Sequence, residues 1–264
     1  GTRILWPEGG GDRALRVRNA DGTIAALGTV DVVLPILHGV HGEDGTVQGF
    51  FDTLEIPYAG GGVLDSALCM DKHFMKIVLQ AAGIPVAPWV TVRDGDVDAS
   101  PTVRAAIDAL GYPLFVKPAR AGSSVGVSKV SDATELPAAL ALAEDDKALI
   151  ESAIVGREVE VAILAGRGGG PARASLPGEV VLTTRDFYDF EGKYLGGDGV
   201  EVVCPAEMTA EELASVQALG VASFTAVGGR GLARVDFFLT ATGLVVNEVN
   251  TMPGFTPSSM FARM

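Results

Sequence analysis

The amino-acid sequence predicts an α/β protein built from two or three modules. Its 264 residues exceed the length of one average domain, and 48% of them are apolar, which is enough to bury a sizeable core. Short apolar runs typical of strands alternate with helical segments, which is the pattern of mixed α/β modules. We expect no membrane span, because no apolar run is long enough for one.

The charge and the cysteines narrow the class of protein. A net charge of −13 argues against a nucleic-acid partner, since phosphate backbones bind basic surfaces. It is compatible with a small-molecule enzyme whose few cations gather at one site. Cys69 and Cys204 have no paired spacing, so we expect buried thiols in a reducing cytoplasm and neither a disulfide framework nor a metal motif.

The predicted elements follow the same alternation along the chain. Strands are expected at 2–6, 31–37 (buried), 56–59, 113–118, 127–130, 148–151, 158–164, 231–240 and 244–250. Helices are expected at 46–54 (capped by Asp44 or Thr46), 66–82, 101–110, 133–145, 209–228 and 258–263. The aromatic and charged segment 186–194 fits neither period, which predicts a loop that packs over something.

The last two strands carry the most informative polar residues. Side chains two positions apart share one face of a strand. The expected faces are Arg234, Asp236 and Phe238 on the first strand and Val246, Glu248 and Asn250 on the second. Two carboxylates and an amide oxygen suit a hard cation such as Mg²⁺, and an arginine beside them could bind a phosphate or an oxyanion. A surface hairpin with a salt bridge is the alternative, which the apolar flanks disfavour because unpaired acids are costly to bury.

A second group of residues points to phosphate binding. The loop Gly122–Gly126 lies between two predicted strands and lacks the Gly-Lys-Ser/Thr of a Walker A loop. Such a hairpin can fold over phosphates through backbone N–H groups and hydroxyls, although most such loops are simple turns. Lys117 ends the preceding strand as a point charge suited to phosphate. Lys72, on a predicted helix, is either a second phosphate cation or a solvated side chain.

Three further sites stay open on the residues alone. Glu151 and Glu158 either bind an adenine amino group and ribose hydroxyls or are exposed charges at strand ends. The loop at 38–45, which contains His38 and His41, either serves a site or holds structural hydrogen bonds. It lacks a third ligand at zinc spacing. The loop 253–259 either offers backbone donors to a carboxylate or caps a helix.

Together these segments resemble the ATP-grasp superfamily and, more closely, the D-alanine–D-alanine ligase family. The matching segments are 38–45 (HGVHGEDG), 70–72 (MDK), 115–130, 151–158, 187–194 (FYDFEGKY), 231–238 and 247–255 (NEVNTMPGF). The resemblance implies a three-module ATP-grasp fold with the nucleotide between two modules. The expected modules are a substrate-side module at 1–64, a central module with the Gly-rich loop at 65–153, and a C-terminal module with metal and catalytic residues at 154–264.

The resemblance also implies a role for each matching position. ATP would be bound by Lys72, Lys117, Ser123, Ser124, Glu151, Ile154, Glu158 and Lys193, and two Mg²⁺ ions, which Mn²⁺ could replace, by Asp236, Glu248 and Asn250. Arg234, Gly254, Ser123, Tyr194 and Lys193 would act in catalysis, and His38, Tyr188, Ser259 and Met260 would contact substrate. Tyr194, hydrogen-bonded to Ser123, would accompany D-alanine rather than D-lactate as second substrate.

The implied activity is ATP-dependent joining of two D-alanines through a D-alanyl phosphate, for peptidoglycan synthesis, by a cytoplasmic homodimer. Another carboxylate–amine ligase of the superfamily and a non-catalytic ATP-binding module are the alternatives. Tyr194 and Ser259 argue against the first, and an Arg234 oxyanion clamp beside metal ligands argues against the second. Ala121 departs from the Glu of many members. We also expect the family's first strand, its Gly-rich loop and the end of the last helix to lie outside these residues, which an intact mass of 27.2 kDa would contradict.

Overall fold

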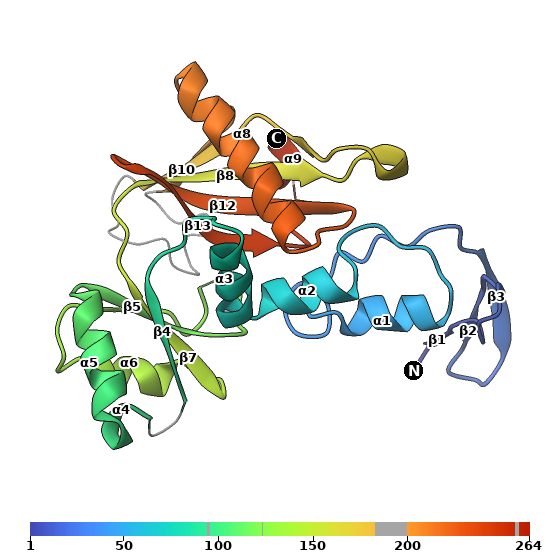
Figure 1. Cartoon of the computed structure of the whole chain (residues 1–264). Helices are drawn as coiled ribbons and strands as arrows, with labels where there is room; N and C mark the ends of the chain where they lie inside the picture. The colour runs from blue at the N-terminus through green and yellow to red at the C-terminus, as the bar shows by residue number, and fades with distance from the viewer. Residues whose placement is uncertain (94–95, 123, 183–199, 257–258) are drawn as a thin grey trace.

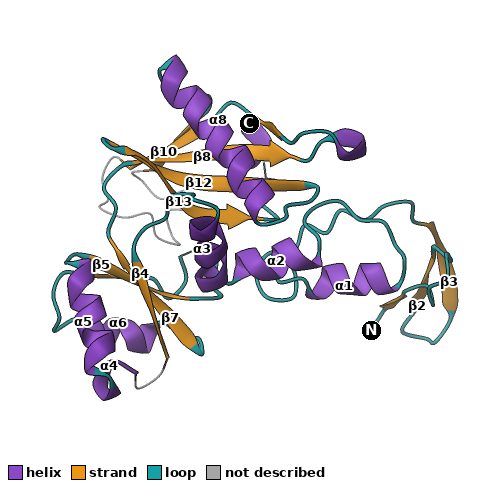
Figure 2. Ribbon diagram, in the orientation of Figure 1, coloured by secondary structure: helices purple, strands orange, loops and turns teal. Residues whose placement is uncertain are grey.

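A computed structural model describes residues 1–264 except 94–95, 123, 183–199 and 257–258. The described chain is organised around three sheets, which lie apart from one another in Figure 1. Helices cover the second and third sheets, whereas α1 (Thr46–Thr53) and α2 (Val63–Met70) run between the first sheet and the rest of the molecule (Figure 2). None of the described helices is long and apolar enough to cross a membrane.

The first sheet is small and antiparallel. It consists of β1 (Arg3–Leu5), β2 (Ala14–Arg18) and β3 (Ile24–Thr29). The prediction of a buried strand at 31–37 is wrong, because Val32 is 59% exposed and the segment makes one parallel bridge, from Val33 to Tyr58. An apolar run is buried only where other elements cover it. Among the described residues, the strand-like contact of segment 31–37 is the bridge to Tyr58, which leaves most of the run exposed.

The second sheet has the order β4-β7-β5-β6 and is antiparallel throughout. Its strands are β4 (Trp89–Arg93), β5 (Leu114–Pro118), β6 (Ser128–Val130) and β7 (Lys147–Ser152), and its helices are α4 (Asp96–Ala99), α5 (Pro101–Leu110) and α6 (Leu136–Leu142). Helix α5 has the predicted bounds, because Ser100 caps its N-terminus and a proline occupies its first position. The predicted helix at 133–145 is shorter in the structure, and strand β4 was not predicted.

The third sheet has the order β11-β10-β8-β12-β13, with β9 paired to β8. Its strands are β8 (Arg157–Leu164), β9 (Arg173–Ala174), β10 (Gly178–Leu182), β11 (Val200–Val203), β12 (Leu232–Thr240) and β13 (Gly243–Asn250). Helix α8 (Ala210–Ala226) crosses one face (Figure 1), and its first turn is closed by a reciprocal capping box between Thr209 and Glu212. The short helix α9 (Met260–Arg263) and a single 3₁₀ turn (Arg167–Gly169) complete the described elements.

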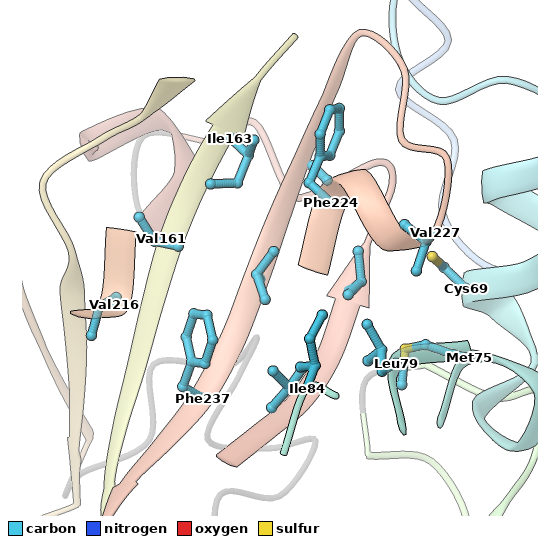
Figure 3. Close-up of a cluster of buried hydrophobic side chains, with 14 of the residues drawn as sticks. Cys69, Met75, Leu79, Ile84, Val161, Ile163, Val216, Phe224, Val227 and Phe237 are labelled. Carbon is cyan, nitrogen blue, oxygen red and sulfur yellow. The ribbon is translucent and has the colours of Figure 1, made fainter. Parts of the chain in front are cut away.

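The predicted helix at 66–82 is two helices, α2 and α3 (Lys72–Ala81). Asp71 breaks the helix with an extended backbone, and its carboxylate accepts the N–H of Phe74 as the N-cap of α3. The helical period continues through Asp71, so periodicity alone does not reveal the break. Met75 and Leu79 of α3 pack into the core of the third sheet, and Figure 3 shows them near Ile84 and Cys69 of the same core.

Candidate active site

A polar face on the third sheet brings five predicted or neighbouring residues together. On β12 and β13, Arg234 pairs with Asn250 and Asp236 pairs with Glu248. On the other side of β12, Glu160 of β8 pairs with Asp236. Residues that face one another on adjacent strands have side chains within contact distance. The three strands therefore bring one guanidinium, three carboxylates and one amide to the same face.

A β-bulge in β13 corrects one predicted neighbour. The pairing shifts by one residue between Asp236 and Phe237, which leaves Asn247 as the extra residue. Val246 consequently pairs with Phe237 on the buried face, and the prediction that Val246 shares a face with Glu248 is wrong. Simple alternation fails here because a bulge resets which side of the strand each later residue occupies.

Arg234 is held by two carboxylates. Its guanidinium makes a bidentate contact with Asp236, from Nε to Oδ1 at 2.7 Å and from an Nη atom to Oδ2 at 2.8 Å. Nε also lies 3.0 Å from Oε2 of Glu160. Burial alone would lower the pKa of Arg234, but the charges of Asp236 and Glu160 raise it above its ordinary value. The side chain is thus a fixed cation beside the carboxylates.

The oxygen atoms of this face fit a hard cation only in part. The amide nitrogen of Asn250 donates to Oδ2 of Asp236 at 2.9 Å, and Glu248 lies opposite the same carboxylate. The described residues contain no group of three or more His, Cys, Asp or Glu side chains placed to hold a metal. Two carboxylates and an amide oxygen would therefore need phosphate oxygens to complete the coordination that Mg²⁺ prefers.

Lys72 connects this face to the Gly-rich loop. It is the first residue of α3, and its ammonium group donates to the carbonyl of Ala121 at 2.5 Å and lies 3.2 Å from Oε1 of Glu248. Its 7% exposure shows that Lys72 is not a solvated surface residue. The Gly-rich loop joins antiparallel β5 and β6 as predicted. Gly126 is required there, because its φ is +70° and a Cβ would lie 2.9 Å from Pro118 Cγ.

Lys117 and Glu151 form a buried ion pair with a third partner. Nζ of Lys117 lies 2.6 Å from Oε2 of Glu151, and Nζ of Lys76 lies 3.1 Å from Oε1. Burial opposes the charge on Glu151, but the two lysines hold its pKa below the ordinary value. The alternative of an exposed charge at the strand end is therefore wrong for Glu151. Its side chain meets lysines here, and a contact with adenine stays a prediction.

The sequence motifs did not single out Lys76 or Glu160. The buried stripe of α3 consists of Lys72, Met75, Lys76 and Leu79, which are at positions i, i+3, i+4 and i+7. A lysine in such a stripe is the signal that could have revealed it. The other predicted nucleotide contacts lie nearby in the chain: Ile154 and Glu158 are half-buried, in the β7–β8 connection and in β8, and Ser124 follows the undescribed Ser123.

The substrate-side residues are placed by two loops. Nδ1 of His38 lies 3.1 Å from the carbonyl oxygen of Met252, which joins the loop at 38–45 to the loop after β13. Glu43 accepts the N–H of Gly39 at 2.5 Å, and burial raises the pKa of Glu43. Gly254 lies close to Ser259, because a Cβ at position 254 would lie 2.7 Å from the hydroxyl of Ser259, which would then have to shift.

Ser259 occupies the N-cap position of α9, but its side chain does not cap the helix. Its hydroxyl instead accepts the N–H of Thr256 in the preceding loop at 3.0 Å. The side chain of Met260 is buried against Gly178. The predicted roles of Ser123, Tyr188, Lys193 and Tyr194 lie outside the described residues.

Comparisons with known proteins agree with this arrangement. The family description "D-ala D-ala ligase C-terminus" matches residues 78–264, and "D-ala D-ala ligase N-terminus" matches residues 11–61. D-alanine–D-alanine ligases of Arthrobacter sp. (strain FB24) and Pseudarthrobacter chlorophenolicus are 50% and 51% identical. Each alignment covers 99% of this chain and 70% of the relative.

Solved structures show the same fold. The VanG D-Ala:D-Ser ligase from Enterococcus faecalis has a TM-score of 0.84 and 37% identity, over 99% of this chain and 73% of the other. The D-alanine–D-alanine ligase from Coxiella burnetii has a TM-score of 0.80 and 33% identity, over 99% and 68%. The predicted ATP-grasp fold is confirmed. With a family match over more than half of its length and relatives at about half identity, the chain belongs to the D-alanine–D-alanine ligase family.

Proposed function

We propose that this protein joins two D-alanines to D-alanyl-D-alanine at the cost of one ATP, for peptidoglycan precursor synthesis. Family membership supports ATP use and a D-alanine substrate. The observation that carries the proposal is the contact of Lys72 with both Ala121 and Glu248. It places the Gly-rich loop beside the carboxylates of the third sheet, where a nucleotide and its cation would meet.

Different residues would bind the phosphates and the adenosine of ATP. Lys72, Lys117 and the loop with Ser123 and Ser124 would hold phosphates, and Lys193 would join them. Glu151, the backbone near Ile154 and Glu158 would bind adenosine. The module limits 1–64, 65–153 and 154–264 would put this nucleotide between the central and C-terminal modules.

Residues of this chain would accelerate the reaction by stabilising the charges that develop in its transition states. The γ-phosphoryl group would pass to the carboxylate of the first D-alanine, and the amine of the second would displace phosphate from the acyl phosphate. Arg234 and the N–H of Gly254 would stabilise the tetrahedral oxyanion. Mg²⁺ held by Asp236, Glu248 and Asn250 would neutralise charge on the phosphates.

Relatives of this chain differ in the second amino acid that they join, since one solved relative is a D-Ala:D-Ser ligase. His38, Tyr188, Ser259 and the N–H of Met260 would contact the substrates. We infer D-alanine as the second substrate, because the curated relatives at about half identity are D-alanine–D-alanine ligases and because Tyr194 would bond to Ser123. D-serine is the second candidate.

Product analysis tests the proposal. The protein is incubated with ATP and Mg²⁺ and with D-alanine, L-alanine, D-alanine plus D-lactate, or D-alanine plus D-serine. We expect ADP and phosphate release with D-alanine, stoichiometric with the dipeptide, and none with L-alanine. Turnover only with D-serine present would move the specificity to the second candidate. Nucleotide binding without turnover of any pair would instead indicate a non-catalytic module. Light scattering tests the proposed homodimer.

A further inference from the structure

Helix α3 carries a buried lysine whose contacts all lie in the central part of the chain. Lys76 is 1% exposed, and its ammonium group donates to the carbonyl of Ala87 at 3.1 Å and lies 3.1 Å from Oε1 of Glu151. The ring of Trp89 lies against it, with its centroid 5.4 Å from Nζ. Lysine is almost never buried to this extent unless its charge is paired.

Glu151 is shared between two lysines, because Lys117 lies 2.6 Å from its second oxygen. One carboxylate cannot neutralise two ammonium groups, so these three side chains carry one surplus positive charge. A buried surplus charge is costly unless an anion balances it. The side chain of Lys117 is 12% exposed and that of Lys76 is 1% exposed, so an anion can approach Lys117 more readily.

We propose that Lys76 is a positioning residue, which neutralises Glu151 and so leaves the charge of Lys117 available to the phosphates of the nucleotide. The inference rests on the proposed function, since it takes Lys117 as a phosphate cation. Without Lys76, Glu151 and Lys117 would form a one-to-one ion pair, and the phosphates would meet a neutral group. Lys76 acts through Lys117 and needs no contact with the nucleotide.

The fold fixes Lys76 independently of any ligand. Met75 and Leu79, its neighbours in the buried stripe of α3, pack in the core of the third sheet (Figure 3). Lys76 leaves the same helix toward Glu151 on β7 of the second sheet. Its ammonium group is therefore already in place before a nucleotide binds.

Nucleotide binding in the absence of D-alanine tests this role. Calorimetric titration with ATP and with adenosine separates phosphate contacts from nucleoside contacts. We expect Lys76→Met to weaken ATP binding about tenfold or more, because a unit charge is lost from the phosphate environment. Adenosine binding should change little. The matched control is Lys129→Met, an exposed lysine on β6, which should change neither affinity.

A second variant distinguishes charge from packing. Adding Glu151→Gln to Lys76→Met removes the carboxylate that would capture Lys117. The ratio of ATP affinity to adenosine affinity should therefore recover toward that of the wild type, because a loss of adenosine contacts at position 151 affects both affinities alike. Equal loss of ATP and adenosine binding, an unchanged ATP affinity in Lys76→Met, or no recovery in the double variant would each overturn the proposal. Wild-type protein that binds ATP but does not turn over D-alanine would refute the proposed function alone.

The unaltered protein offers an independent measurement if Lys76→Met does not fold. Burial lowers the pKa of Lys76 to about 8, against the attraction of Glu151. The charged groups that face it are Glu151 of β7, Lys117 of β5 and Lys72 of its own helix. From about pH 7 to about pH 9 the ratio of ATP affinity to adenosine affinity should fall as Lys76 loses its proton. A constant ratio over this range would overturn the proposal.

Discussion

Two clusters of charged side chains differ in the sign of their surplus. The strand cluster, on β8, β12 and β13, has Glu160, Asp236 and Glu248 around one Arg234. The lysine cluster has Lys76 and Lys117 around one Glu151. Because unbalanced charge in a partly buried site favours an ion of opposite sign, the strand cluster is suited to a cation and the lysine cluster to an anion.

Lys72 lies at the junction of these regions. Its ammonium group contacts Glu248 of the strand cluster and the carbonyl of Ala121, which directly precedes the Gly-rich loop after Lys117. A metal–nucleotide complex carries both signs of charge, so it could satisfy both clusters at once. The surplus charge of each cluster, more than any single contact, therefore indicates which part of the ligand that cluster would hold.

Asp236→Asn should break the strand cluster most severely. We expect kcat/KM to fall about a thousandfold, because loss of a metal ligand removes several kcal/mol of charge stabilisation. Steady-state ADP release measures the effect, and Mg²⁺ titration should show a raised metal requirement. Glu211→Gln, an exposed acid in the first turn of α8, is the matched control and should keep full activity. Turnover of Asp236→Asn within a fewfold of wild type would contradict the assignment.

Arg234→Lys preserves the charge of the strand cluster and removes its geometry. Lysine cannot reproduce the bidentate contact with Asp236, so kcat should fall about a hundredfold, as for the loss of one oxyanion donor. ATP affinity, measured by calorimetry, should change far less than kcat. If ATP affinity fell as much as kcat, Arg234 would serve nucleotide binding and not the oxyanion.

Glu151→Gln should break the lysine cluster and reveal its pH dependence. The pKa of Glu151 is below its ordinary value in the folded protein, so its stabilising effect is present above about pH 4.5 and is lost as pH falls further. We expect the free energy of unfolding of the variant to be about 3 kcal/mol lower than that of the wild type at neutral pH, because two ammonium groups lose their partner. In urea titrations this difference should shrink below about pH 4.5. A difference that is independent of pH would argue against an ionised Glu151.

Glu160→Gln should have the smallest effect. Glu160 is the second carboxylate on Arg234, so its loss leaves the bidentate contact with Asp236 intact. We expect kcat to fall about tenfold, in line with the loss of a residue that orients an active group, and ATP affinity to stay unchanged. Full activity would show that Asp236 alone orients Arg234.

Local patterns predicted much of this structure, and contacts distant in the chain account for the rest. The strands β12 and β13 follow from apolar alternation and helix α8 from its helical pattern, and each of these signals lies within a single segment. The break at Asp71 and the exposure of Val32 depend on which elements the chain places beside them, which periodicity does not encode. Lys76 was missed for the same reason, since its partner Glu151 lies on a strand much later in the sequence.

The candidate site divides in the same way. Arg234, Asp236 and Lys117 could be selected because polar residues interrupt apolar strands, which a single segment reveals. The contact of Glu151 with two lysines and the contact of Arg234 with two carboxylates could not be predicted. Each of them depends on how separate elements pack against one another. The roles of Lys193 and Tyr194 remain predictions that lie outside the described residues.

The bulge at Asn247 determines where the hairpin can change length. Asn247 is the extra residue opposite the Asp236–Phe237 step, so its deletion would give a regular strand with Glu248 and Asn250 still facing Asp236 and Arg234. Deletion of Val249 would instead turn Asn250 toward the core. We therefore expect the first deletion variant to keep its melting temperature and most of its turnover, and the second to lose both. Whether this hairpin tolerates the deletion of one residue thus depends on which residue is removed.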